Sequence, residues 1–334
     1  MKIFVAMPRG KVRDSYMDEA VINRFKAHGA EINEMDRQLT EAEFIEKMKT
    51  TEVLVTGWGH LDIKAHMVKD SALKLIVHTG GSVGALTEPE LFDMGIRVLT
   101  GNEYFAESVA EGTIAYCLYA LRKMPQYSGA LSMRGEWKSE EGDGGTEGLL
   151  DQTVGIISVG AISKHVLRIG KAFHLKFKVF STRRDEKLAE EYGFTYASLE
   201  EIFTTCKVVS VHTAASAATR HMINRELLSL LKPHQILINT SRGMVIDEDA
   251  MVEMLQQKRF RAVLDVYNQE PLPAGHPLIG LDNAMLFPHC GGPTIDRRIP
   301  ISNGLLDDIE SFMKGGAMAN EVTKEVAGRM TKNL

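Results

Sequence analysis

Short apolar runs alternate with helical patterns along almost the whole chain, and this alternation restricts the possible folds more than any other feature. The first series has strand-like runs at 2–7, 53–56 and 74–78. The second series has six such runs, at 153–157, 177–180, 208–211, 236–239, 262–265 and 285–287. Helical crossovers make neighbouring strands parallel and cover both faces of a sheet. The sequence therefore predicts an α/β fold, and six strands is the number in a complete dinucleotide-binding fold.

Two threonines in the first series match the start of a helix. Thr40 with Glu43, and Thr87 with Glu90, each have the spacing of a capping box, in which the two side chains bond each other's backbone N–H groups. We expect each threonine to be the N-cap of a helix.

Length and composition favour a two-domain protein without a nucleic-acid or membrane partner. A chain of 334 residues exceeds one typical core, and its net charge of −5 argues against a nucleic-acid binder. The N-terminal apolar run is too short for a signal peptide, and no apolar run approaches the roughly 20 residues that span a bilayer. Cys117, Cys206 and Cys290 lie far apart and outside any metal-ligand spacing. We expect a cytoplasmic, reduced protein with no metal site.

The turn after the first strand of the second series resembles a phosphate-binding loop. Residues 158–163 read SVGAIS where the usual fingerprint reads G-x-G-x-x-G. Gly160 keeps the middle position, at which the backbone approaches a pyrophosphate. Ser158 adds a Cβ where the turn is tightest, whereas Ser163 is small enough to pack there. The motif alone fits either a cofactor turn, with Ser158, Gly160, Ala161 and Ile162 as contacts, or an ordinary strand–helix turn.

The end of the next strand favours NADP over NAD. An NAD site normally has an Asp or Glu at this place, which binds the ribose 2′-hydroxyl. Here Ser181 takes that place, and Thr182, Arg183 and Arg184 follow. Guanidinium groups pair well with a 2′-phosphate. The alternative is that both arginines are solvated loop charges beside the acidic residues that follow.

Three further strand ends carry residues that can do chemistry. Arg242 follows the 236–239 run, Glu270 lies five residues after Asp265, and His289 follows the last run of the series. Ligands of open α/β sheets lie beyond the carboxyl ends of the strands. An Arg, an acid and a His that arrive at that edge separately are difficult to explain as core packing.

With these stretches in view, the chain resembles the D-isomer-specific 2-hydroxyacid dehydrogenase family over essentially its whole length. The matching segments are HTGGSVGAL (78–86), SVAEGT (108–113), RGEW (134–137), TVGIISVGAIS (153–163), VSVHTA (209–214), INTSRG (238–243), LDVYNQEP (264–271) and PHCGGPT (288–294). The resemblance implies two doubly wound parallel-sheet domains. A flavodoxin-like substrate-binding domain would comprise 1–102 and 295–334, and a Rossmann NAD(P)-binding domain would comprise 103–294.

The resemblance also implies catalytic roles. Arg242 would bind the carboxylate and carbonyl of the substrate through charge-assisted hydrogen bonds. His289 would act as general acid on the carbonyl oxygen in one direction and as general base in the other. Glu270 would pair with His289 and keep a proton available on it.

The remaining site residues divide between substrate and cofactor. Backbone groups at Gly80, Gly81, Ser82 and Val83 would receive the substrate carboxylate. Trp58 and His60 follow a strand and are our candidates for shaping substrate choice, although Trp58 could simply pack. The other cofactor-contacting positions that the resemblance implies are Thr113, His212, Thr213, Thr240, Asp265, His289 and Gly291.

The stretch 108–123 predicts a long apolar helix with little polar face. Such a helix must be heavily buried, either within the chain or in a subunit interface. The resemblance implies the second, so we expect a homodimer that associates through this region.

Our first hypothesis is therefore an oxidoreductase that transfers a hydride between a nicotinamide dinucleotide and C2 of a small 2-keto or 2-hydroxy acid. Two alternatives stay open at this point. The chain could be a non-catalytic regulatory or interaction protein that binds a dinucleotide on the same fold, which the altered glycine fingerprint favours. It could also act on another small anion, such as formate or phosphite.

Overall fold

The computed structural model describes residues 1–137 and 145–331, and the chain divides into two compact units. Unit 1 comprises Met1–Ser108 together with Pro293–Leu334, and unit 2 comprises Val109–Gly292. Each unit is an α/β sandwich, as the alternation of strands and helices predicts. The assignment of substrate binding to unit 1 and cofactor binding to unit 2 stays a prediction and is proposed below.

Unit 1 contains one six-stranded sheet with the order β13-β5-β4-β3-β1-β2. All neighbouring strands are parallel except β13, which runs antiparallel to β5. The order of the first five strands is that of a flavodoxin-like fold. The strands are β1 (Ile3–Val5), β2 (Glu31–Ile32), β3 (Val53–Thr56), β4 (Leu75–His78), β5 (Arg97–Thr100) and β13 (Glu321–Val322).

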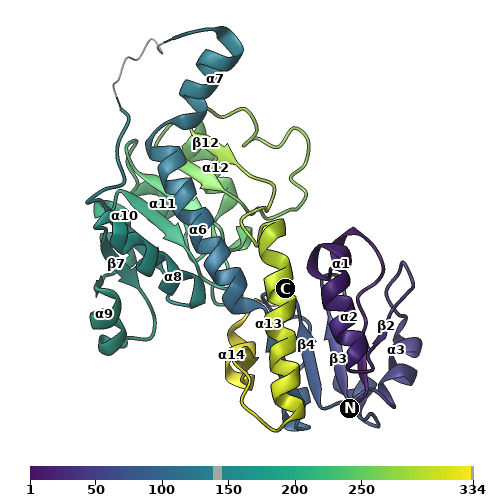
Figure 1. Cartoon of the computed structure of the whole chain (residues 1–334). Coiled ribbons are helices and arrows are strands. Elements are labelled where there is room, and N and C mark those ends of the chain that lie inside the picture. Colours follow the sequence, from purple (N-terminus) through teal and green to yellow (C-terminus); the bar gives the residue numbers. More distant parts are fainter. Residues whose placement is uncertain (138–144, 332–334) are drawn as a thin grey trace. The chain divides into compact units, whose positions relative to one another are not determined.

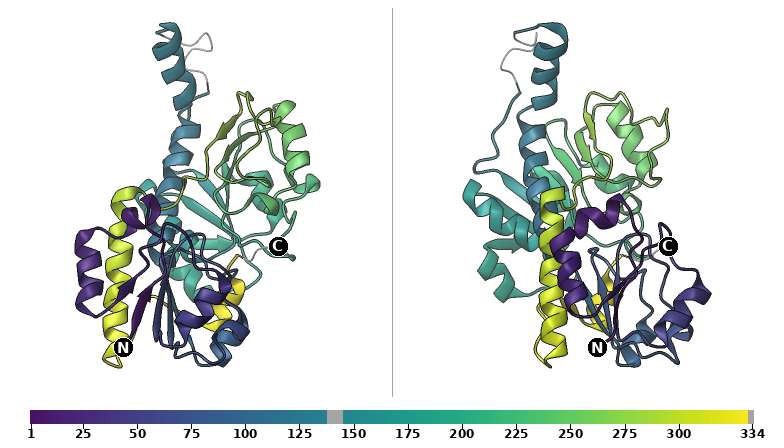
Figure 2. Two further views of the ribbon diagram at one scale, coloured as in Figure 1. Left: turned by 90° about the vertical axis from the view of Figure 1, so that its right-hand side faces the viewer. Right: turned by 45° about the vertical axis from the view of Figure 1, so that its right-hand side comes forward.

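Helices cover both faces of this sheet because consecutive strand residues point to opposite faces. Val53 and Val55 of β3 pack in one core with residues of α2 and α13, whereas Leu54 packs in the other core with residues of α3. Figures 1 and 2 show α13 running beside α2. The helices of unit 1 are α1 (Lys11–Tyr16), α2 (Glu19–Ala27), α3 (Glu41–Met48), α4 (Ala65–Val68), α5 (Pro89–Asp93), α13 (Ile295–Met313) and α14 (Lys324–Arg329), and α6 (Asn102–Leu121) begins here.

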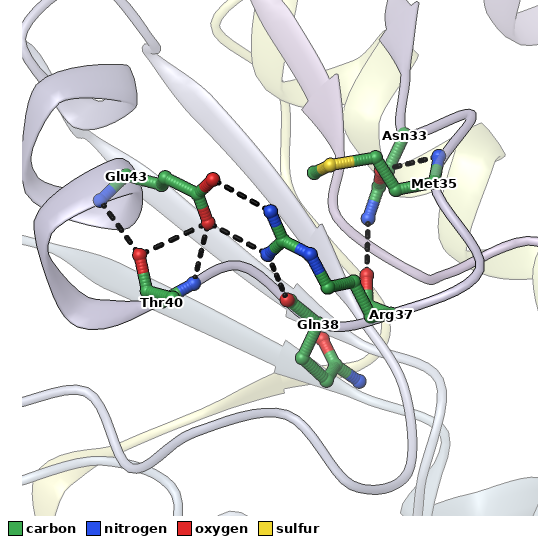
Figure 3. Close-up of polar contacts among 6 residues, drawn as sticks. All are labelled: Asn33, Met35, Arg37, Gln38, Thr40 and Glu43. Atoms are coloured by element: carbon green, nitrogen blue, oxygen red, sulfur yellow. Dashed lines mark hydrogen bonds and ion pairs between the residues drawn. The ribbon is translucent and has the colours of Figure 1, made fainter.

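One of the two predicted capping boxes in unit 1 is present. Thr40 caps α3, and its side chain and that of Glu43 bond each other's backbone N–H groups, as Figure 3 shows. The prediction for Thr87 is wrong, because α5 begins only at Pro89 and its N-cap is Glu88. The hydroxyl of Thr87 instead donates to the carbonyl of Val83. Proline favours the first helical position, which explains the later start.

Unit 2 contains a fully parallel sheet with the order β12-β11-β10-β9-β6-β7-β8. This is the doubly wound order of a dinucleotide-binding fold with one further strand at an edge. The described part of this unit has seven strands rather than the predicted six, because a short edge strand, β8, went unpredicted. The strands are β6 (Thr153–Ile157), β7 (Lys176–Phe180), β8 (Phe194–Tyr196), β9 (Val208–Val211), β10 (Ile236–Asn239), β11 (Arg261–Leu264) and β12 (Ala284–Leu286).

The helices of unit 2 again cover both faces of its sheet. They are the main part of α6, then α7 (Met124–Arg134), α8 (Ala161–Gly170), α9 (Glu186–Tyr192), α10 (Leu199–Thr205), α11 (Arg225–Ser229) and α12 (Glu248–Gln256), with 3₁₀ turns at Lys171–Phe173 and Gly243–Val245. No helix in the described ranges is both long enough and apolar enough to cross a membrane.

The long apolar helix α6 is buried mainly within unit 2 itself. Ala110, Ile114, Cys117 and Leu121 all belong to a core that this helix shares with β6 and α8. The apolar character of the helix therefore does not require a subunit interface. The next helix, α7, projects away from the rest of unit 2 (Figures 1 and 2).

Candidate active site

His289 and Glu270 form a hydrogen-bonded pair beyond the carboxyl ends of β11 and β12. The distance from Nδ1 of His289 to Oε2 of Glu270 is 2.5 Å. The other carboxylate oxygen of Glu270 accepts the backbone N–H of Tyr267 at 3.0 Å. The two side chains are 47% and 34% exposed, so a ligand in solution can reach them. The pairing leaves Nε2 of His289 as the ring atom that can exchange a proton with a substrate.

Arg242 follows β10, the strand next to β11 in the sheet. Its Nη1 donates to the carbonyl of Ser241 at 2.6 Å, and its own carbonyl accepts from the side chain of Asn239 at 3.0 Å. Burial lowers the pKa of Arg242, and the carboxylate of Glu270 opposes that shift. A guanidinium in such a half-buried place interacts strongly with an anion that replaces its lost hydration.

Asp265 holds the loop that carries His289. Its two oxygens accept the backbone N–H groups of Cys290 at 2.8 Å and Gly291 at 2.9 Å. The hydroxyl of Tyr116 donates to the same carboxylate at 3.3 Å. Gly291 has no room for a side chain, because a Cβ there would lie 2.7 Å from Oδ2 of Asp265. Asp265, predicted as a cofactor contact, therefore has both oxygens engaged within the protein and positions the loop after Pro288.

The turn between β6 and α8 is ordered by a hydrogen bond between its two serines. Ser158 has a φ of 77°, a conformation that favours glycine. The hydroxyl of Ser163 donates to the carbonyl of Ser158 at 2.7 Å. A Cβ at Gly160 would meet no atom within 4 Å, so this part of the turn is open to a ligand. The altered fingerprint therefore still forms a turn, in which the hydroxyl of Ser163 bonds the backbone of Ser158.

We expect Ser158→Gly to be more stable than Ser158→Ala by about 1 kcal/mol in the free energy of unfolding. Both variants lose the hydroxyl of Ser158, and only the alanine keeps a Cβ at positive φ, which costs an L-residue on the order of 1 kcal/mol. Chemical denaturation of the two variants measures the difference. Equal stabilities would mean that the turn relaxes to a different φ at no cost.

Two buried polar atoms just after neighbouring strands of the same sheet have no hydrogen-bond partner among the residues that the structure describes. They are Nδ1 of His212, just after β9, and Oγ1 of Thr240, just after β10. Burial lowers the pKa of His212 to about 4, so its ring is neutral at physiological pH. Buried polar groups normally have hydrogen-bond partners, and orphaned ones at a strand edge suit the hydroxyls of a ribose or the oxygens of a phosphate. The neighbouring Thr213, also predicted as a cofactor contact, is buried as well.

Thr113, another predicted cofactor contact, lies in α6. It is fully buried, and its hydroxyl donates to the carbonyl of Val109 within α6 at 2.8 Å. In contrast, Gly160, the open position of the turn, together with His212 and Thr240 gives unit 2 a set of groups that fits a dinucleotide.

The basic loop after β7 has a defined local structure. The hydroxyl of Ser181 accepts the N–H of Arg183 and donates to its carbonyl. The guanidinium of Arg184 lies 5.4 Å from the ring centroid of Tyr196. Asp185 caps α9 by accepting the N–H of Leu188. The side chains from Thr182 to Arg184 are exposed, and the acid that follows them is used as a helix cap.

In unit 1, the two glycines after β4 lie directly over aromatic rings. A Cβ at Gly80 would lie 2.3 Å from Nε2 of His78, and one at Gly81 would lie 3.1 Å from the ring of Phe105. The hydroxyl of Ser82 donates to the carbonyl of Thr331 at 3.3 Å. Glycine is therefore required for the close approach of this backbone to the rings.

Of the predicted substrate contacts in unit 1, Val83 and His60 both make contacts within the protein. Val83 is fully buried, and its N–H points at the sulfur of Met330, 3.5 Å away. The ring of His60 packs edge-on against Phe44, and its Nδ1 bonds the carbonyl of Leu61. Trp58, by contrast, is 52% exposed and lines a cavity.

The strand order of unit 2, its tight turn before α8 and its polar groups at neighbouring strand ends define a class, the α/β proteins with a dinucleotide-binding domain. The family model described as "D-isomer specific 2-hydroxyacid dehydrogenase, NAD binding domain" matches residues 114–291. The chain therefore belongs to the D-isomer-specific 2-hydroxyacid dehydrogenase family of oxidoreductases, as the resemblance of its motifs implies.

Individual relatives agree with this family. The chain is 31% identical to a D-3-phosphoglycerate dehydrogenase of Methanocaldococcus jannaschii, over 85% of this chain and 54% of that protein. It is 32% identical to a glyoxylate reductase of Aeropyrum pernix, over 70% of this chain and 71% of that protein. An acyclic imino acid reductase, solved in complex with NADPH and D-Arg, has a TM-score of 0.79 and 26% identity, over 97% of this chain and all of that one. The chain thus spans about half the length of the first of these relatives.

Proposed function

We propose that this protein transfers a hydride between a nicotinamide dinucleotide and C2 of a small 2-keto or 2-hydroxy acid. The observation that carries the proposal is the 2.5 Å pair of His289 and Glu270 beyond β12 and β11. Strand β11 is the neighbour of β10, which Arg242 follows. Relatives named glyoxylate reductase and D-3-phosphoglycerate dehydrogenase support the substrate class. In this proposal, unit 1 is the substrate-binding domain, and unit 2 is the cofactor-binding domain and also carries Arg242, Glu270 and His289.

Each of the three residues has a separate task. Arg242 binds the substrate carboxylate and polarises the keto oxygen with the same guanidinium, which fixes the carbonyl relative to the protein. His289 donates the proton on Nε2 to the carbonyl oxygen during reduction and takes it back during oxidation. Glu270 accepts from Nδ1 of His289 and fixes the orientation of the ring, so that Nε2 is the atom that faces the substrate. The bound nicotinamide supplies or accepts the hydride.

The cofactor turn does not favour the non-catalytic alternative. That hypothesis rests on the serines at 158 and 163 as signs of a decayed motif, yet Ser163 bonds Ser158 in an ordered turn. A proposed set of cofactor contacts follows from unit 2: the open backbone at Gly160 for the pyrophosphate, and His212 and Thr240 for ribose or phosphate oxygens. The proposal fails if the purified protein binds neither NADH nor NADPH.

We further propose that NADPH is preferred over NADH. Ser181 replaces the acid that selects NAD, and Arg183 and Arg184 supply exposed positive charge at that place. A relative that was solved with NADPH supports this choice. We expect Arg183→Gln to weaken NADPH binding about 10-fold and to leave NADH binding unchanged, because only NADPH has a 2′-phosphate that this arginine can bind.

Fluorescence titration with both cofactors measures this preference. Lys176→Gln is the matched control, since it removes one exposed positive charge from the opposite end of the same strand, β7. An equal effect of Arg183→Gln on both cofactors would mean that this arginine contributes only general charge. A preference of the unaltered protein for NADH would contradict the proposal directly.

We propose that the protein forms a homodimer and is cytoplasmic. Because the apolar residues of α6 are largely used within unit 2, we move the proposed contact surface from the 108–123 region to α7 and residues 135–137. Met133 is 87% exposed and Trp137 is 82% exposed there. Light scattering measures the mass in solution, and a monomer at micromolar concentration would contradict the dimer.

The cysteines support the cytoplasmic proposal. Cys117, Cys206 and Cys290 are free thiols, which fits a reducing compartment.

A further inference from the structure

A cavity of about 240 Å³ opens in unit 1 at the carboxyl ends of β1 and β3. Its wall consists of the consecutive residues 7–13, which follow β1, and of Trp58, which follows β3. Three of these residues are cationic, namely Arg9, Lys11 and Arg13, and none is acidic. The cavity therefore combines one aromatic wall with a concentrated positive charge.

The three cations have little compensation from the protein. Arg9 and Lys11 are exposed, and their side chains have no hydrogen bond or ion pair with any residue in 1–137 or 145–331. Arg13 is only 6% exposed, and its Nε has no hydrogen-bond partner among those residues. The carboxylate of Asp14 is 3.8 Å from that nitrogen, beyond hydrogen-bond distance, and is largely solvated. A buried guanidinium that keeps a free N–H favours an anionic ligand.

A network of hydrogen bonds fixes the backbone that carries these charges. The N–H of Arg9 donates to the carbonyl of Met35 at 2.7 Å, and Nη1 of Arg13 donates to the carbonyl of Asn33 at 2.7 Å. Figure 3 shows how this supporting segment is itself held. The side chain of Asn33 bonds the N–H of Met35 and the carbonyl of Arg37, and Arg37 makes a two-bond ion pair with Glu43. The loop is therefore formed before any ligand arrives, which reduces the ordering cost of binding.

The cavity and the glycine loop after β4 belong to one edge of the sheet. Strand β3 lies between β1 and β4, and all three are parallel. The ring of Trp58 lies 6.2 Å from that of His78 and 6.1 Å from that of Phe105. These are the same two rings over which Gly80 and Gly81 lie. An unbroken group of aromatic rings thus connects the predicted carboxylate loop with the cavity.

We propose that this cavity binds a second anionic group of the substrate, a carboxylate or a phosphate, beside the glycine loop of unit 1 that is predicted to receive the first carboxylate. Arg9 and Lys11 contact that group, Arg13 adds its buried charge, and Trp58 packs against the carbon chain. The substrate class is then a 2-keto acid with two anionic ends. The inference rests on the proposed function and narrows it.

The test compares matched pairs of 2-keto acids with the full-length protein and NADPH or NADH. One pair is 2-oxoglutarate and 2-oxopentanoate, which share a chain length and differ in the terminal carboxylate. The other is phosphohydroxypyruvate and hydroxypyruvate, which differ in the phosphate. We expect kcat/KM to be at least about 10-fold higher for the dianionic member of one pair. A preference within the first pair would identify the bound group as a carboxylate, and a preference within the second would identify it as a phosphate.

Substitution assigns this preference to the cavity. We expect Arg9→Met to reduce kcat/KM for the dianionic member about 10-fold or more and to change kcat/KM for the monoanionic member by no more than about 2-fold. Arg9→Lys should restore part of the loss, because it returns the positive charge without the guanidinium. Lys26→Met, an exposed charge on α2 outside the cavity wall, is the control and should change neither.

The outcomes separate this inference from the proposed function. The anion site would be overturned if both members of each pair had equal kcat/KM. It would also be overturned if Arg9→Met and Lys11→Met both left a preference for the dianion unchanged. The hydride-transfer proposal would stand in either case. Absence of turnover for all four acids would overturn the proposed function. Retained binding of NADPH in that last experiment would show that the protein is intact.

Discussion

The variant His289→Asn is expected to retain cofactor binding and to lose about 100- to 10,000-fold in kcat, the usual contribution of a general acid or base. Asparagine suits this position because His289 has a φ of 51°, and Asn is among the residues that tolerate that conformation. The backbone bonds from Cys290 and Gly291 to Asp265 should therefore persist. The loss then reports the missing proton on Nε2. Steady-state kinetics in both directions and a fluorescence titration with the cofactor measure the two effects.

His174→Asn is the matched control for this prediction. His174 also has a positive φ, 53°, and its ring also lies near an acid, Asp151, at 3.8 Å. It follows a 3₁₀ turn and does not belong to the strand ends that carry the candidate site. We expect the control to keep kcat within about 2-fold. A normal kcat for His289→Asn would mean that water or another group protonates the carbonyl oxygen.

The variant Arg242→Gln is expected to lower kcat/KM about 100- to 10,000-fold, with much of the loss in KM. Glutamine keeps one uncharged amide donor on a shorter side chain and removes the charge and the paired N–H groups. Each hydrogen bond to a charged group is worth roughly 1.5 to 3 kcal/mol. We expect Arg242→Lys to recover only part of this loss, because an ammonium cannot make the two-bond contact.

Two comparisons make this prediction specific. Arg225→Gln removes another arginine of unit 2, one that pairs with Glu253 on the surface, and should leave kcat/KM unchanged. Cofactor affinity should be the same in Arg242→Gln as in the unaltered protein. If the substitution instead lowered cofactor affinity and left KM for the keto acid unchanged, Arg242 would belong to the cofactor site.

The parallel sheets could be predicted from sequence because each central strand is a short, continuous apolar run between helical patterns. Strands β2, β8 and β13 were missed because two or three residues at a sheet edge have no periodicity that separates them from a loop. β5 was missed although it is longer, since Arg97 and Thr100 make its run resemble the turn before it. The helix after Thr87 begins late because Pro89 occupies its first position.

The candidate site could be predicted only in part, for a physical reason. Arg242, Glu270 and His289 each stand just beyond a recognisable strand, so the topology alone implies a common edge. The bond from Tyr116 to Asp265 joins residues 149 positions apart, and no local pattern encodes it. The hydrogen bond between Ser163 and Ser158 is also invisible as a motif, because the fingerprint describes only glycines. Three cations at 9–13 follow the first strand and are visible in the sequence. Only the cavity in the structure indicates that they can bind an anion.

The most direct test of the central claim follows the hydride itself. The protein is incubated with a 2-keto acid and nicotinamide cofactor deuterated at C4, and the product is analysed by mass spectrometry and proton NMR. We predict a 2-hydroxy acid with deuterium at C2, and no such product from His289→Asn on the same timescale. Binding of the cofactor without deuterium at C2 of any of the four acids named above would contradict the account.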